Sequence, residues 1–260
     1  MIYFGSKTLS ADLFSMLKEV EKKKLDAELP GSGYRNGQNT DQILSSLSHE
    51  LRTPLSILSS NLQLLKNNRN LDESIRLETF QLFEEALLSV NRLLDQIHFL
   101  NLANKGELKK SPSLVSVEEL IDRLFDQPHP HYYKIDRIKL EKNLSNEKFC
   151  TDGLLLEKII SGLLDNAFKF STKEILLSIA DKDGNLTIEI SDQGAGIPEQ
   201  EIDHIFDPFY RCANVKMISG TGLGLSIVKK SLDCLNGSIS VESMIAKGTN
   251  FKLKIPADEC

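Results

Sequence analysis

The first half of the chain carries apolar residues at helical spacing. Leucines recur every seventh residue over 44–65, and further leucines fill the adjacent stripe. This heptad pattern is typical of a helix whose apolar seam packs against other helices. After a polar break at 67–72, the apolar residues of 80–97 alternate spacings of three and four. The pattern predicts an antiparallel helical hairpin, and pairing with an identical hairpin would complete a dimeric four-helix bundle.

The residues before this hairpin predict a separate short segment. Apolar positions over 8–29 indicate an amphipathic helix, and glycine and proline at 30–37 indicate a loop. We interpret 1–40 as an N-terminal helix and linker, with a remnant of an input or HAMP-like region as one explanation. The hairpin then forms a domain over 41–105.

The pattern changes to short β-type runs mixed with helices after Gly106. Asp183-Gly184 between two such runs is a strong hairpin signal. The residues of 106–260 therefore predict a mixed α/β domain, and the whole chain an α+β fold. The predicted strands are 113–117, 137–140, 174–180, 185–191, 237–241 and 249–255, and the predicted helices are 116–125, 154–168 and 223–235.

Composition narrows the class of protein. A length of 260 residues suits two domains, and the net charge of −6 argues against a nucleic-acid binder. No apolar run is long enough to span a membrane, so we expect no membrane contact by the chain as given. We expect it to be cytoplasmic, or the cytoplasmic portion of an inner-membrane sensor. The four cysteines are scattered without metal-ligand spacing, which predicts free thiols in a reducing compartment.

One histidine of the first bundle helix has unusual neighbours. If the seam leucines occupy heptad position a, His49 falls at position f and should be exposed. Most lone helical histidines are plain surface residues. Here Glu50 could bond one ring nitrogen, Thr53 lies one turn further on, and Pro54 should bend or loosen the helix. We therefore take His49 as a candidate nucleophile with acid–base assistance.

A second group of polar and glycine residues lies in the α/β part. Glycines at 220, 222 and 224 precede a predicted helix, where backbone amides and the helix N-terminus favour phosphate. Asp192 follows a strand and could accept a hydrogen bond from an adenine amine. Asn166 offers an oxygen to Mg²⁺, and Lys169, one turn away, could reach a phosphate. No βαβ unit or P-loop surrounds these glycines, so neither common nucleotide motif explains them.

These segments resemble those of a known family. Ser48-His49-Glu50-Leu51-Arg52-Thr53-Pro54-Leu55 resembles the phosphoacceptor box of sensor histidine kinases. The segments that begin at 165, 192, 206 and 220 resemble, in order, the N, G1, F and G2 boxes of the Bergerat-type ATP-binding fold that histidine kinases share with gyrase, Hsp90 and MutL. The resemblance covers about 44–256.

The resemblance implies a function and a set of site residues. It implies an ATP-dependent protein-histidine autokinase that forms a homodimer, uses Mg²⁺ and passes the phosphoryl group from His49 to the receiver domain of a response regulator. Glu50 and Thr53 resemble an E-x-x-T phosphatase element, and 211–219 would form a lid over ATP. The residues implied to bind the nucleotide are Asn166, Lys169, Asp192, Gly194, Gly196, Phe209, Arg211, Gly220, Thr221, Gly222, Leu223, Gly224 and Thr249, with Asn166 at the metal.

One position departs from the family pattern. One turn before Asn166, these kinases usually carry asparagine and their hydrolytic relatives a catalytic glutamate, whereas this chain has Gly162. The absence of that carboxylate weighs against an ATP-gated machine of the chaperone or topoisomerase type. That machine and a degenerate, non-catalytic signalling scaffold remain the alternative functions.

Overall fold

The computed structural model describes residues 36–260 apart from 69–71, 127–135, 147, 183 and 219, with side chains from Leu47 onward except His49. The predicted N-terminal helix at 8–29 and most of the predicted linker lie outside the described residues. The chain divides into two units, Met1–His49 and Glu50–Cys260. No helix among the described residues has both the length and the apolar character needed to cross a membrane.

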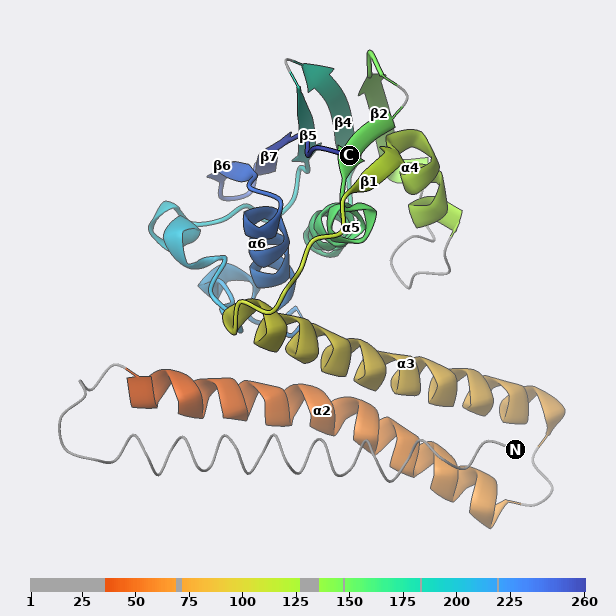
Figure 1. Ribbon diagram of the computed structural model, residues 1–260. Helices are drawn as coiled ribbons and strands as arrows, with labels where there is room; N and C mark the ends of the chain where they lie inside the picture. Colours follow the sequence, from red (N-terminus) through yellow and green to blue (C-terminus); the bar gives the residue numbers. More distant parts are fainter. Residues whose placement is uncertain (1–35, 69–71, 127–135, 147, 183, 219) are drawn as a thin grey trace. The chain divides into compact units, whose positions relative to one another are not determined.

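The predicted helical hairpin is confirmed (Figure 1). Helix α2 (Asn36–Asn67) starts earlier than expected, so Gly37 lies in the helix and not in the linker. The helix continues through Pro54, which is buried. Helix α3 (Glu73–Asn104) begins after Asp72, whose carboxylate accepts a hydrogen bond of 2.9 Å from the Ser74 amide and caps the helix.

The hairpin covers only part of its apolar surface. Ala86, Leu93 and Leu100 of α3 are buried at heptad spacing. Other large apolar side chains on both helices are 39–60% exposed. These exposed side chains are Leu55, Ile57, Leu62, Leu64, Ile75, Leu77, Phe80, Leu82, Leu87 and Leu88.

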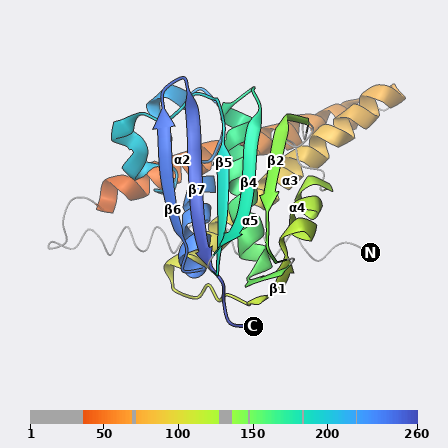
Figure 2. The same ribbon diagram turned by 90° about the horizontal axis from the view of Figure 1, so that it is seen from above.

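The predicted mixed α/β domain follows the hairpin, with helices α5 and α6 covering one face of a five-stranded sheet (Figure 2). The strand order is β2-β4-β5-β7-β6, with β2 parallel to β4 and every other pair antiparallel. The elements are β1 (Ser113–Ser116), α4 (Val117–Asp126), β2 (Ile138–Asn143), β3 (Lys148–Thr151), α5 (Gly153–Phe170), β4 (Ile175–Lys182), β5 (Asn185–Ser191), the 3₁₀ helices η2 (Glu199–His204) and η3 (Ala213–Val215), α6 (Gly224–Cys234), β6 (Ser238–Met244) and β7 (Gly248–Pro256).

Alternating burial along the strands explains the layered core. Every second residue of β5, and of β4 from Ile175 to Ile179, is buried, including Leu177 and Ile188, and the residues between them are half-buried. This period of two places one apolar face of the sheet against the helices. Leu156 and Leu163 of α5, both fully buried, complete the layer.

The strands and helices expected for 106–260 are all present, with ends displaced by up to a few residues. The strand β3 was not predicted. It pairs with β1 in a separate two-stranded sheet, in which Leu114 lies opposite Cys150. Its four residues are too few for period-two alternation to stand out in the sequence.

The prediction that all four cysteines are free was wrong for two of them. Cys150 and Cys260 form a disulfide across 110 positions of sequence, with their Cα atoms 5.9 Å apart. The last strand returns the chain terminus to β3, where the Asp258 amide donates to the Cys150 carbonyl at 2.9 Å. Cys212 and Cys234 are free and half-buried.

Candidate functional site

Helix α5 places three polar side chains on the side of a cavity. Asp165, Asn166 and Lys169 are half-buried and line the cavity, whereas Ala167 and Phe168 between them belong to the core. The 3.6-residue period of the helix accounts for this division. Burial raises the pKa of Asp165 to about 7, against the opposing influence of nearby cations.

Asp192 is held at the end of β5 by two backbone contacts. Its amide donates to the Thr249 carbonyl at 2.9 Å, and its Oδ1 accepts from the Gly194 amide at 2.7 Å. Burial raises the pKa of the Asp192 carboxyl, and the backbone hydrogen bonds to it oppose that rise. A Cβ on Gly248, whose φ is +115°, would lie 1.9 Å from the Asp192 carbonyl oxygen, so only glycine fits beside the aspartate.

The glycine-rich segment before α6 approaches Lys169 closely. A Cβ on Gly220 would lie 1.9 Å from the Nζ of Lys169, so the ammonium group rests against the backbone of this turn. Burial lowers the pKa of Lys169, and the positive charge of Arg211 lowers it further. Thr221 Oγ1 accepts from the Leu223 amide at 3.2 Å, and α6 begins at the next residue. The turn therefore brings a lysine and a helix N-terminus to the same part of the cavity.

A backbone hydrogen bond joins the two residues that flank the predicted lid, 211–219. The Phe209 amide donates to the Gly222 carbonyl at 3.0 Å, with Phe209 at a φ of 65°. Within the lid, Arg211 donates to the carbonyls of Lys216, at 2.9 Å, and of Ile218. Arg211 thus orders the lid backbone. The sequence predicts only a contact of Arg211 with the nucleotide.

Three further hydrogen bonds in and beside the lid involve Glu201, Tyr210, Ala213 and Asn214, which the sequence did not indicate. The Tyr210 hydroxyl donates to Glu201 Oε2 at 2.9 Å, and the Ala213 amide donates to the same atom at 3.1 Å. Asn214 Nδ2 donates to the Gly196 carbonyl at 2.8 Å, which ties the lid to the loop after Asp192. No local spacing links these residues, so only the folded chain reveals them.

Most of the expected nucleotide-binding residues line one cavity of about 490 Å³, a volume suited to a nucleotide. Gly194, Phe209 and Leu223 instead support its walls through the backbone contacts already described, and Leu223 is fully buried. The expected residues that line the cavity are Asn166, Lys169, Asp192, Gly196, Arg211, Gly220, Thr221, Gly222, Gly224 and Thr249.

The candidate phosphoacceptor segment lies on α2. His49 is the last residue of the first unit. Its side chain is outside the described part of the structure, so its expected exposure stays a prediction. Glu50 is half-buried, and Thr53 is exposed. All three residues lie within the helix, as their spacing predicts.

The departure at Gly162 has a packing explanation. A Cβ there would lie 2.8 Å from Cγ2 of Val228 on α6, a side chain with no exposed surface. Glycine at this position lets α5 and α6 approach closely. The space that asparagine would need is therefore occupied by the valine.

Two domain families match the chain. Residues 151–259 match the histidine kinase-, DNA gyrase B- and HSP90-like ATPase family, and residues 40–107 match the His Kinase A phospho-acceptor domain. A curated relative, the signal transduction histidine-protein kinase ArlS of Staphylococcus aureus strain USA300, is 32% identical over 219 residues. The match covers 82% of this chain and 48% of that relative, so the chain spans about half the length of the curated relatives it matches.

Solved structures share the fold. The histidine kinase AdeS of Acinetobacter baumannii superposes with a TM-score of 0.61 at 24% identity, covering 81% of this chain and 98% of that one. Full-length ShkA, crystallised in complex with AMPPNP, gives a TM-score of 0.55 at 24% identity, covering 85% of this chain and 46% of that one. These structures show the shared fold, whereas the two domain matches and the 32% identity to ArlS establish that the chain belongs to the sensor histidine kinases of two-component signal transduction, with a HisKA domain followed by an ATP-binding HATPase_c domain.

Proposed function

We propose that the chain is an ATP-dependent autokinase that phosphorylates His49 and passes the phosphoryl group to an aspartate in the receiver domain of a response regulator. The observation that carries the proposal is the cavity that gathers Asp192, Lys169 and the glycine turn, in a chain whose helical hairpin bears His49 within a phosphoacceptor sequence. Because ATP is a cytoplasmic substrate, we infer that the chain works in the cytoplasm, alone or as part of an inner-membrane sensor.

Different walls of the cavity would bind different parts of ATP. Asp192, oriented by the Gly194 amide, is placed to accept a hydrogen bond from the exocyclic amine of adenine. At the other side, Lys169 and the amides at the start of α6 would bind the phosphates. The polar groups thus distinguish an adenine end from a phosphate end.

Mg²⁺ fits the residues present. Asn166 offers a side-chain oxygen at the cavity wall, one turn of α5 from Lys169. Magnesium commonly takes one or two protein oxygens and fills its remaining positions with phosphate oxygens and water. When bound, it would neutralise charge on the phosphates, and Asn166 would hold it beside them.

The chemical step would be an in-line transfer to imidazole. One ring nitrogen of His49 attacks the γ-phosphorus, a P–N bond forms, and the bond to the bridging oxygen breaks to release ADP. Glu50, the next residue on the helix, would bond to the other ring nitrogen and take up its proton. The phosphoryl group would then move from His49 to the aspartate of the receiver.

A homodimer is the proposed working state. The apolar side chains left exposed on α2 and α3 recur along both helices. A second hairpin would cover them as a four-helix bundle, which removes apolar area from water at about 25 cal/mol per Å². The exposed surface supports this part of the proposal.

Incubation with γ-labelled ATP tests the autokinase function. We expect an acid-labile, alkali-stable phosphoryl group on the protein, absent in His49→Gln although that variant still binds ATP. His98→Gln, which changes an exposed histidine of α3, is the matched control and should incorporate label normally. Steady ATP hydrolysis without labelled protein would indicate an ATP-gated machine, and neither activity would indicate a scaffold.

A further inference from the structure

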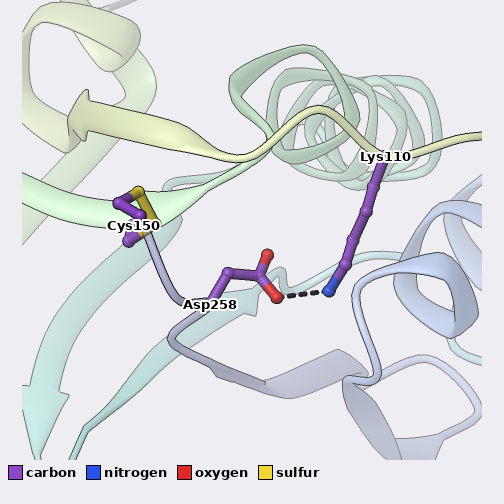
Figure 3. The surroundings of a disulfide bond; sticks show 4 residues. Lys110, Cys150 and Asp258 are labelled. Carbon is purple, nitrogen blue, oxygen red and sulfur yellow. Dashed lines mark hydrogen bonds and ion pairs between the residues drawn. A yellow bond between two sulfur atoms is a disulfide. The ribbon is translucent and has the colours of Figure 1, made fainter.

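The disulfide lies beside the segment that joins the hairpin to the ATP-binding domain. The linker, residues 105–112, runs from the end of α3 to the start of β1. Lys110 of this linker pairs with Asp258, two residues before Cys260 (Figure 3). Both side chains of the pair are largely buried, at 26% and 12% exposed. The tail that carries Cys260 therefore also contacts the linker.

The two cysteines differ sharply in access. Cys150 lies in β3 and is 8% exposed, whereas Cys260 is exposed at the chain end. Their Cα separation of 5.9 Å lies within the range that a disulfide can span. An exposed thiolate can attack a small-molecule disulfide, and a neighbouring cysteine can then attack the mixed disulfide that forms.

We propose that Cys150 and Cys260 are a reversible thiol–disulfide site, oxidised by small-molecule disulfides, whose redox state sets how firmly Asp258 holds the linker. The Cys260 thiolate attacks one sulfur of the small disulfide, which forms a mixed disulfide and releases one thiolate. Cys150 then attacks the Cys260 sulfur and releases the second thiolate. The two protons lost by the protein end on the two small thiols, so one small disulfide becomes two thiols and the protein gains one disulfide.

Two backbone hydrogen bonds hold the tail besides the disulfide. The Ala257 amide donates to Gly184 and the Asp258 amide donates to Cys150, each at 2.9 Å. Reduction removes the covalent link between the tail and β3, which leaves the tail held by noncovalent contacts that open more readily. Asp258 is then less firmly placed, and Lys110 loses a fixed partner.

The linker keeps contacts that do not depend on the disulfide, among them the Glu107 amide with the Leu102 carbonyl at 2.9 Å. The Ser111 amide donates to Asp152 Oδ2 at 2.7 Å, and Asp152 also caps α5. Reduction is therefore expected to loosen the linker around Lys110 without unfolding the domain. Because this linker joins the hairpin to the ATP-binding domain, a firmly held linker should slow transfer of the phosphoryl group from ATP to His49. This last step rests on the proposed function.

Thiol titration and hydrogen exchange test the site without reference to kinase activity. Treatment of the reduced chain with oxidised glutathione should lower the titratable thiols from four to two and release two glutathione molecules per chain. Amides of 105–112 should exchange at least about threefold faster in the reduced form. In Asp258→Asn they should exchange fast in both forms. Four titratable thiols after treatment, disulfide-linked dimers, or equal exchange in both forms would overturn the proposal.

Two cysteine variants separate the site from the other thiols. Cys260→Ser should abolish the loss of thiols on treatment with oxidised glutathione, and Cys212→Ser, which changes a free cysteine, should keep the loss of two thiols. In the unsubstituted chain, autophosphorylation should be at least about threefold slower in the oxidised form. Equal rates would overturn the regulatory role, whereas absence of labelling in both forms would instead contradict the proposed kinase function.

Discussion

Replacing Gly162 by alanine should have two opposing effects on the stability of the ATP-binding domain. Alanine in a helix interior is more favourable than glycine by about 1 kcal/mol. The added Cβ would lie 2.8 Å from Cγ2 of Val228, which is fully buried. A β-branched side chain has little rotamer freedom, and overpacking a core costs about 1–3 kcal/mol. We therefore expect Gly162→Ala to destabilise the domain by about 0–2 kcal/mol.

The effect of Gly162→Ala on stability should change sign when Val228 is shortened to alanine. In a Val228→Ala background the clash is absent, so Gly162→Ala should stabilise the domain by about 1 kcal/mol. The coupling energy is then about 1–3 kcal/mol, well above the scatter of roughly 0.3–0.5 kcal/mol for independent sites.

Calorimetry of the four proteins, each with all 260 residues, would measure this cycle. The relevant transition is the one whose midpoint rises when ATP is added, because a ligand stabilises the domain that binds it. For a domain of this size, 1 kcal/mol shifts the midpoint by roughly 2–4 °C. An equal effect of Gly162→Ala in both backgrounds would refute the packing explanation of the missing asparagine.

Three further substitutions test the candidate site. Asp192→Asn should weaken ATP binding by about 1–3 kcal/mol, because a charge-assisted hydrogen bond is lost. Calorimetric titration measures the affinity, with Asp203→Asn at an exposed position as the control. Unchanged affinity would show that Asp192 does not bind ATP. Thr53→Ala should slow dephosphorylation of the receiver at least about tenfold, which is roughly 1.4 kcal/mol in the barrier, while autophosphorylation at His49 is kept. Equal loss of both activities would instead indicate that the Thr53 hydroxyl has a structural role and bonds to the helix backbone. The raised pKa of Asp165 means that the folded chain holds a proton that the unfolded chain releases, so stability should fall as pH rises from 3.8 to about 7 and then level off. Asp165→Asn should therefore raise the thermal midpoint more at pH 8 than at pH 5, and an equal gain at both would contradict the shift.

The features that the sequence predicts well are those set by local spacing. The leucine heptad over 44–65 requires only the helical period, and the structure has a helix there. The glycine turn at 220–224 and Asp192 were likewise indicated by residue type next to a predicted helix or strand. Both line the cavity because such turns occur at the ends of those elements.

The features that the sequence did not predict depend on contacts between distant segments. The disulfide joins Cys150 to the chain end only because β7 returns the tail to β3. The contact of Glu201 with Tyr210 likewise forms across the loop that precedes the lid. No periodicity encodes either pair, since each depends on how the complete sheet and its loops close.

The single hydrogen bond between Phe209 and Gly222 has a consequence for how such kinases can diverge. A loop whose ends are already fixed gains length cheaply, because doubling it costs only about 0.6 kcal/mol in closure entropy. Met217 at its tip is 98% exposed and constrains little. Insertions and substitutions between these two ends should therefore leave the start of α6 where it is. The predicted lid can therefore change in length and sequence during evolution while the start of α6, the proposed phosphate site, is kept.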